Sequence, residues 1–262
     1  MTYETLLCDV AEGVATLTFN RPEVLNATND QFYKDMSAFI GRVADDPAIR
    51  CVILTGAGRG FCAGADVRGM DPNRPPLSKR RRHRWILSTV LGPLIRLEKP
   101  VIAAVNGVAV GAGMNIALAA DILIASEAAS FSQIFAKMGL VPDLGGLHLL
   151  TRVVGLNKAK ELCFTARRIS AAEALALGIA NEVVAADALL PRATALAREI
   201  AAGPPFAISM MKTLLNMSST ATLEQMLEYE SYAQSLAYVS GENAEGALAF
   251  KEKRAPKFAP AE

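Results

Sequence analysis

The chain has 262 residues, of which 52% are hydrophobic and 20% are charged. Its 27 Lys and Arg residues against 26 Asp and Glu residues argue against a disordered chain and against a nucleic-acid-binding protein. The four cysteines form no close pair and there are only two histidines, so we expect neither a disulfide scaffold nor a metal site.

The amino-terminal region and the longest apolar run indicate whether the protein is exported or inserted into a membrane. Residues 1–10 lack the basic flank and apolar stretch of a signal peptide, and we expect a cytoplasmic protein. Residues 101–125 have the length of a membrane span, but Asn106, Asn115 and Asp121 would be costly at a bilayer centre. We therefore expect a buried strand and a buried helix here, and no membrane partner.

The first predicted elements are a strand and a helix. Apolar and polar residues alternate over 15–19, the pattern of a half-buried strand that ends at residues 20–22. Residues 28–31 have the form of a capping box, with Thr28 first and Gln31 last. The apolar residues between 32 and 43 then share one helical face, which predicts an amphipathic helix.

The middle of the chain alternates strands with helices. Residues 51–54, 101–105 and 122–125 are continuous apolar runs, which are typical of strands covered on both faces. A turn is expected at 55–60 and a short small-residue helix at 111–120. This order predicts an α/β protein with a parallel sheet and crossover helices.

Two further regions complete the organisation. Residues 71–76 are rich in proline, and the basic run 79–84 precedes a helix-like stretch to Leu97. Ser170 caps a short helix that Gly178 ends.

From Asp187 the pattern is helical, apart from a break at 203–205. We therefore expect a core over residues 1–186 and a helical subdomain over residues 187–262 that mediates oligomerisation.

Two glycine-rich turns follow predicted buried strands, at residues 56–60 and 111–113. Neither is a dinucleotide-binding fingerprint, because Phe61 and Ile116 stand where the third glycine would be. Either both are tight turns without chemistry, or their free backbone N–H groups hold a developing oxyanion. The small residues Ala65 and Ala112 would permit the second role.

Four motifs in order resemble the enoyl-CoA hydratase/isomerase (crotonase) family over essentially the full length. The motifs are residues 20–27 (NRPEVLNA), 60–66 (GFCAGAD), 106–113 (NGVAVGAG) and 139–146 (GLVPDLGG). The resemblance implies a repeated ββα spiral core, a helical C-terminal subdomain, and trimers or dimers of trimers. It also implies an acyl-CoA thioester as substrate, with coenzyme A as part of that substrate and no separate cofactor.

The resemblance also assigns site residues. The backbone N–H groups of Ala65 and Ala112 are expected to form the oxyanion hole. Asp66 is expected to tie the oxyanion loop through bonds from its side chain to the backbone. The substrate contacts expected from the family are Leu25, Ala27, Ala63, Asp66 and Val67, with Phe250 and Lys253 supplied by a neighbouring subunit.

The departures from the family pattern concern the reacting groups. Hydratases of the family carry two glutamates where this chain has Asn115 and Phe135, which remain expected substrate contacts. Asp143 coincides with the aspartate of the isomerase branch, which includes the phenylacetate-pathway and Δ3,Δ2-enoyl-CoA isomerases. Its apolar neighbours favour a raised carboxyl pKa. We therefore expect an enoyl-CoA isomerase with Asp143 as proton shuttle.

Two alternatives and several side chains stay open at this stage. The chain could be a hydratase with non-standard residues or a non-catalytic acyl-CoA-binding protein. Cys62 is interpreted as a small buried residue rather than a nucleophile, and His83 and His148 are weak candidates. The basic run 79–84 is either a solvated helix face or a contact for CoA phosphates.

Overall fold

The structure is a computed structural model that describes residues 2–69, 71 and 73–258. Its strands form two sheets, one with the order β1-β2-β3-β5-β7-β10 and one with the order β4-β6-β8-β9. The first sheet consists of β1 (Leu6–Ala11), β2 (Val14–Phe19), β3 (Cys51–Gly56), β5 (Val101–Val105), β7 (Ile122–Ser126) and β10 (Glu182–Val184). The second consists of β4 (Gly60–Cys62), β6 (Val108–Val110), β8 (Ser130–Ser132) and β9 (Ile169–Ser170).

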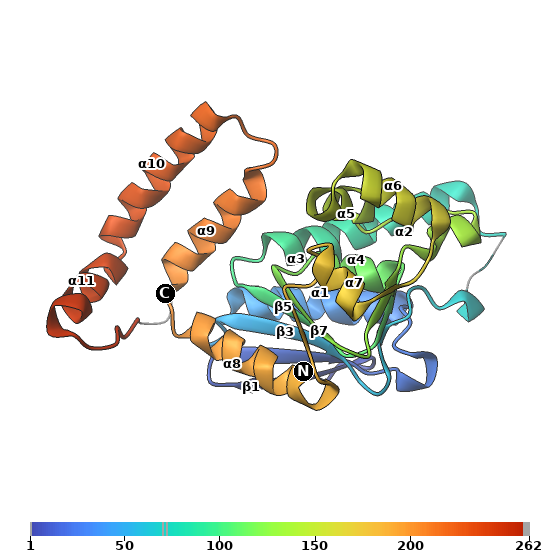
Figure 1. Ribbon diagram of the computed structural model, residues 1–262, viewed down its shortest axis with the longest axis horizontal. Coiled ribbons are helices and arrows are strands. Elements are labelled where there is room, and N and C mark those ends of the chain that lie inside the picture. The colour runs from blue at the N-terminus through green and yellow to red at the C-terminus, as the bar shows by residue number, and fades with distance from the viewer. Residues whose placement is uncertain (1, 70, 72, 259–262) are drawn as a thin grey trace.

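The helices surround these sheets, as Figure 1 shows. Those before Asp187 are α1 (Asp30–Asp45), α2 (Pro76–Ile86), α3 (Gly92–Arg96), α4 (Ala112–Leu118), α5 (Gly146–Val154), α6 (Leu156–Thr165) and α7 (Ala171–Ala176). A π-helical segment, Leu87–Leu91, joins α2 to α3 without a break. The later helices are α8 (Leu189–Ala201), α9 (Pro205–Met217), α10 (Leu223–Val239) and α11 (Glu242–Glu252).

The strands repeat in pairs that wind into a spiral. Strands β3, β5 and β7 pair in parallel in the large sheet, and each is followed by a short strand that enters the small sheet. These short strands, β4, β6 and β8, also pair in parallel. Helix α4 completes the pair β5 and β6. The expected parallel sheet and the expected spiral are thus both present.

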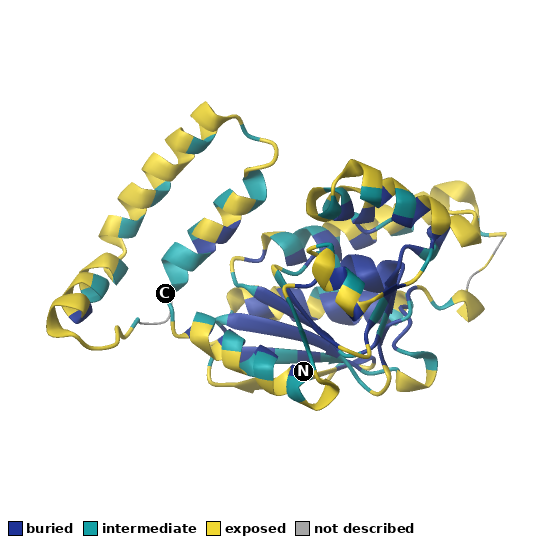
Figure 2. Cartoon of the chain, in the orientation of Figure 1, coloured by how far each residue is buried: buried dark blue, intermediate teal, exposed yellow. Residues whose placement is uncertain are grey.

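Both faces of the large sheet are covered, which explains the continuous apolar runs. In β3, Val52 and Leu54 pack into the core on the α1 side, whereas Cys51 and Ile53 pack against α8. Residues on alternate sides of a strand face opposite layers, so a strand between two helical layers has no polar side. Figure 2 shows these strands as the buried centre of the molecule.

Some local expectations were wrong. The cap of α1 is Asn29, whose side chain accepts a hydrogen bond from the Phe32 N–H. The Thr28 hydroxyl instead bonds the Tyr33 hydroxyl at 3.0 Å, so the expected capping box is not formed. The apolar pattern does not predict the small sheet, because strands of two or three residues are too short to show alternation.

The helical region that begins at Asp187 has two parts. Helix α8 belongs to the core by its contacts, since Leu189, Ala193 and Ala197 pack on the large sheet. Helices α9 to α11 extend away from it (Figure 1), and α10 has no buried residue. One anchor of α9 is Lys212, whose ammonium group lies 2.7 Å from a carboxylate oxygen of Asp121 and donates to the Lys99 carbonyl.

Candidate active site

The loop that carries Ala65, residues 63–66, follows β4 and lies against the segment before α1, so Ala65 is not on the glycine-rich turn 56–60, which joins β3 to β4. Thr28 pairs with Ala65 in a parallel bridge, in which the Thr28 N–H donates to Gly64 and the Asp66 N–H donates to Thr28. Gly64 has a φ of +94°, a value that favours glycine. Because the bridge uses the groups on either side of Ala65, the Ala65 N–H itself points away from it.

The second loop brings its own N–H beside the first. Ala112 is the first residue of α4, so its N–H has no acceptor within the helix. A Cβ at Gly64 would lie 2.9 Å from the Val110 carbonyl and 3.8 Å from the Ala112 nitrogen, which shows that the loops touch. Over residues 2–69, 71 and 73–258, neither the Ala65 nor the Ala112 N–H donates a hydrogen bond within the chain.

A third segment, residues 20–28, completes this edge of the site. The buried Asn26 donates to the Gly60 carbonyl at 2.7 Å and accepts from the Arg21 N–H at 2.8 Å. The Ala63 N–H donates to the Leu25 carbonyl at 2.9 Å. These bonds place Leu25, Ala27 and Ala63 in one neighbourhood, next to the Ala65 loop.

Asp66 is held between two arginines. Its carboxylate accepts from Arg68 at 2.8 Å and from Arg21 at 3.0 Å, and Arg21 also donates to the Ala27 carbonyl. The Arg68 hydrogen bonds, together with that from Arg21, hold the pKa of Asp66 far below its usual range. Asp66 therefore stays ionised and links the Ala65 loop to residues 20–28, a role that suits a support and not a proton carrier.

Asn115 lies in the first turns of α4 and is fully buried. Its amide nitrogen donates to the Asp143 carbonyl at 2.8 Å, and its amide oxygen accepts from the Gln133 side chain at 2.7 Å. Gly146 packs directly on this amide, where a Cβ would lie 2.4 Å from the Asn115 nitrogen. Asn115 thus clamps the loop that carries Asp143 onto α4, three residues after Ala112.

Phe135 lies beside Gly111, the residue that precedes α4. Its ring is buried, and a Cβ at Gly111 would lie 3.6 Å from it. The residue therefore provides an apolar wall beside the N-terminus of α4. It cannot donate, accept or move a proton.

Asp143 is positioned by a tight turn between Gly139 and α5. Leu144 and Gly145 both have positive φ values, and the Gly146 N–H donates to the Asp143 carbonyl at 2.8 Å. Burial raises the pKa of the Asp143 carboxyl, and this effect exceeds the opposing effects of His83 and Arg82. The predicted raised pKa is therefore present, and its main cause is desolvation, as expected.

A sequence model of the family described as enoyl-CoA hydratase/isomerase matches residues 9–260. This chain belongs to the enoyl-CoA hydratase/isomerase family. A 1,2-epoxyphenylacetyl-CoA isomerase of Escherichia coli (strain K12) is 42% identical over 257 residues, 97% of this chain and 98% of the relative. A short-chain-enoyl-CoA hydratase of Clostridium acetobutylicum is 39% identical, and the match covers 92% of each chain.

Solved structures confirm the crotonase fold of this family member. An enoyl-CoA hydratase/isomerase from Cupriavidus metallidurans CH34 superposes with a TM-score of 0.93 at 34% identity, and all of both chains is covered. An enoyl-CoA hydratase from Bacillus anthracis also has a TM-score of 0.93, at 32% identity, with 98% of this chain and 100% of that chain covered.

His83 is only a weak candidate from the sequence, but it lies beside Asp143 in the structure. Its Nδ1 atom lies 3.8 Å from Asp143 Oδ2. The sequence contains a feature that could have pointed to His83, because this residue is one of only two histidines and stands in a run of cationic residues. The other histidine, His148, is exposed on α5.

The remaining singled-out residues lie apart from Asp143 or are inert. Cys62 is fully buried, and burial raises the pKa of its thiol to about 12, so it stays protonated and is no nucleophile. Val67 is exposed just after the first loop. Phe250, which is 86% exposed, and Lys253 lie at the end of α11, which the single chain does not bring to Asp143 (Figure 1).

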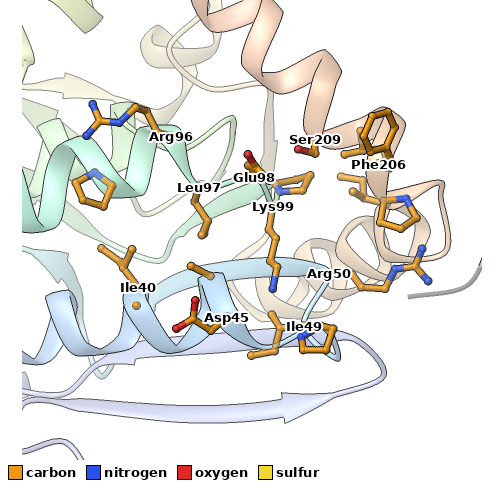
Figure 3. A pocket seen from close by; sticks show the side chains of 18 of the residues that line it. Ile40, Asp45, Ile49, Arg50, Arg96, Leu97, Glu98, Lys99, Phe206 and Ser209 are labelled. Atoms are coloured by element: carbon orange, nitrogen blue, oxygen red, sulfur yellow. The ribbon is translucent and has the colours of Figure 1, made fainter. Parts of the chain in front are cut away.

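A cavity of about 940 Å³ lies elsewhere, between α1, the segment after α3 and the start of α9 (Figure 3). Ile40, Lys99 and Phe206 are among the residues that line it, and none of the expected site residues does. Its position between the core and the C-terminal helices separates it from the chemistry expected at Asp143.

Among the described residues, no group of three or more His, Cys, Asp or Glu side chains is arranged to hold a metal ion. In the same part of the chain, no helix has the length and apolar character needed to cross a membrane.

Proposed function

We propose that this family member is an enoyl-CoA isomerase that moves a double bond of an acyl-CoA thioester with Asp143 as proton shuttle. The observation that carries the proposal is the position of the Asp143 carboxyl. Burial desolvates this carboxyl, and Asn115 ties the backbone carbonyl of the same residue to the helix whose first N–H belongs to Ala112. The two positions where hydratases of the family carry glutamates hold Asn115 and Phe135 instead.

The proposed reaction needs one base and one anion site. Asp143 removes a proton from the carbon next to the thioester carbonyl, and the N–H groups of Ala65 and Ala112 stabilise the resulting dienolate. Asp143 then delivers a proton to the far carbon, which shifts the double bond. In comparable enzymes each oxyanion donor contributes roughly 2.7–4 kcal/mol to transition-state stabilisation.

The electrostatics of the site support this role. A base works best when its pKa is close to the working pH. Burial raises the pKa of the Asp143 carboxyl and so brings it closer to that pH. Asp66, the other carboxylate near the loops, is fixed in its ionised form by Arg68 and Arg21. The two carboxylates are therefore suited to different tasks.

Hydration is the second candidate, because several similar proteins are named hydratases. The water-activating pair would have to be replaced by Asp143 alone. The Asn115 amide is an unsuitable substitute, since both of its ends are already bonded to Gln133 and Asp143. A non-catalytic acyl-CoA-binding role is the third candidate, and any turnover that depends on Asp143 would exclude it.

The direct test is incubation of the enzyme with 2-enoyl, 3-enoyl and aromatic acyl-CoA thioesters, followed by mass spectrometry and NMR. Isomerisation leaves the mass unchanged, whereas hydration adds one water. We expect isomerisation, and the similarity to a 1,2-epoxyphenylacetyl-CoA isomerase makes ring-derived thioesters part of the panel. A product that has gained water, at a rate that Asp143→Asn leaves intact, would contradict the proposal.

We further infer a cytoplasmic homo-oligomer, a trimer or a dimer of trimers. Helices α9 to α11 expose apolar residues that a neighbouring subunit would cover, among them Leu223, Leu227 and Phe250. In such an assembly Phe250 and Lys253 would reach the acyl-CoA of the neighbour. Truncation before Gly246 is expected to weaken assembly and CoA binding together, as measured by sedimentation and calorimetry.

A further inference from the structure

The two oxygens of the Asp143 carboxylate have different surroundings. Oδ1 is buried and has no hydrogen-bond partner among the residues that the structure describes. Oδ2 faces the imidazole of His83, with 3.8 Å between Oδ2 and Nδ1. The His83 side chain is 47% exposed and that of Asp143 is 32% exposed. Oδ1 is thus not the exposed part of Asp143, and the imidazole lies beside Oδ2 where both side chains reach the solvent.

The other charged or titratable groups around this pair cannot exchange its protons. Arg82 precedes His83 on α2, is paired with Asp30 of α1, and lies 5.6 Å from the centre of the Tyr33 ring. An arginine stays protonated. Burial raises the pKa of Tyr33 far above its usual range, so that phenol stays protonated as well. Imidazole is the side chain that both accepts and releases a proton near neutral pH.

We propose that His83 relays protons between Asp143 and the solvent during isomerisation, an inference that rests on the proposed function. After Asp143 has taken the substrate proton, it passes that proton to Nδ1 of His83, and the half-exposed imidazolium releases this same proton from Nδ1 to water. A proton from water then binds Nδ1 and passes to Asp143. Asp143 then protonates the far carbon, so one proton is taken and one is returned.

The packing of α2 allows the approach that the relay needs. A hydrogen bond requires the N···O distance to shorten by about 1 Å, and catalytic hydrogen bonds are often long before substrate binds. Of the residues of α2, only Ile86 at its end is buried, and the helix starts at Pro76 without a capping side chain. Because Ile86 and the Leu87–Leu91 segment hold the nearby end of α2 in the core, the approach comes from the His83 side chain, which is half exposed and has room to rotate toward Asp143.

The test measures where the deuterium removed from C2 of the substrate is found after the reaction. The probe is 3-hexenoyl-CoA with deuterium in both positions at C2, converted in ordinary water. One deuteron stays at C2, and the other passes through Asp143 either to C4 of the product or to the solvent. In the wild type we expect loss to the solvent. In His83→Gln, which keeps a polar side chain but carries no proton, label at C4 is expected to rise at least about threefold.

Three comparisons separate the relay from other roles of His83. His83→Lys supplies a positive charge but stays protonated near neutral pH and cannot accept the proton of Asp143, so it is expected to retain label like His83→Gln. Added imidazole is expected to restore label loss in His83→Ala. His148→Gln, at the exposed histidine on α5, is the matched control and is expected to match the wild type.

The outcomes distinguish this inference from the proposed function. Label retained at C4 by the wild type, or equal label in the wild type and His83→Gln, would overturn the relay while isomerisation stands. Wild-type label loss in His83→Lys would reduce His83 to an electrostatic role and also overturn it. Absence of isomerisation in the wild type would instead overturn the proposed function.

Discussion

The loops around Asp66 and Asp143 place the same side chain in opposite environments. Asp66 is bonded to Arg68 and Arg21, and its pKa is held far below the usual range. Asp143 has one buried oxygen without a partner, faces a histidine at 3.8 Å, and has its pKa raised by burial. A carboxylate that is fully bonded serves as a fixed support, whereas one that is desolvated remains available to take up a proton.

The largest expected effect comes from removing each carboxylate in turn. Asp143→Asn keeps the volume but removes the base, and kcat for isomerisation is expected to fall roughly 10²–10⁴-fold. Asp66→Asn is expected to reduce kcat less than about tenfold, because this side chain acts only through the loop. Steady-state assays of both variants, with CoA-thioester binding measured by calorimetry, provide the check. Equal losses in the two variants would remove the proposed distinction.

The next effect concerns the clamp on the Asp143 loop. Asn115→Ala removes the bond to the Asp143 carbonyl, and a displaced base is expected to reduce kcat by roughly 10–10²-fold. Gln133→Leu is the matched control, because it breaks the bond at the other end of the Asn115 amide and leaves the bond to Asp143. We expect the control to lose stability, by about 1–3 kcal/mol, with a smaller change in kcat. A larger kcat loss in the control would show that the clamp does not position Asp143.

Replacement of Asp143 and replacement of Asp66 are expected to change the stability of the folded protein in opposite directions. The pKa of Asp143 is raised on folding, so its ionisation disfavours the folded state at neutral pH, and Asp143→Asn is expected to keep or raise Tm. The pKa of Asp66 is lowered, so its contribution is present above the ordinary value of 3.8 and is lost as the pH falls through the folded value. Asp66→Asn is expected to lower Tm at pH 7 by roughly 2–4 °C. Thermal unfolding at pH 7 and pH 3 tests both signs.

The smallest effect is expected at Arg68. Its side chain is 65% exposed, and Arg21 still bonds Asp66 when Arg68 is changed to Gln. Exposed ion pairs contribute little, so Arg68→Gln is expected to change kcat and KM by less than about twofold. Arg21→Gln is the contrasting variant, because Arg21 also bonds the Ala27 carbonyl. A loss in Arg68→Gln that equals the loss in Arg21→Gln would show that the outer arginine holds the loop.

Most of the large sheet could be predicted, because its strands carry long apolar runs. Residues 51–54 and 101–105 have no polar side, and this pattern follows directly from burial between α8 and the α1 side. The small sheet could not be predicted in the same way. Its strands contribute only two or three residues each, such as Ile169–Ser170 and Gly60–Cys62, and their pairing depends on contacts distant in sequence.

Part of the site was also accessible from sequence. The two loops around Ala65 and Ala112 and the carboxylate of Asp143 stand in local motifs. The bond from Asn115 to the Asp143 carbonyl joins residues 28 positions apart, and the contact between His83 and Asp143 joins elements with no shared pattern. Such pairs depend on how helices are oriented, which composition and periodicity do not specify.

The π-helical segment between α2 and α3 has a consequence for that orientation. It closes with a bond from the Gly92 N–H to the Leu87 carbonyl, one residue wider than an α-helical turn. Each residue of an α-helix advances the chain by about 100° around the axis. Deleting one residue from Leu87–Leu91 would therefore rotate every side chain of α2 by about that angle relative to the core. His83 would leave Asp143 although no residue near either had been changed, so the register of this helix is itself part of the geometry that the proposed reaction requires.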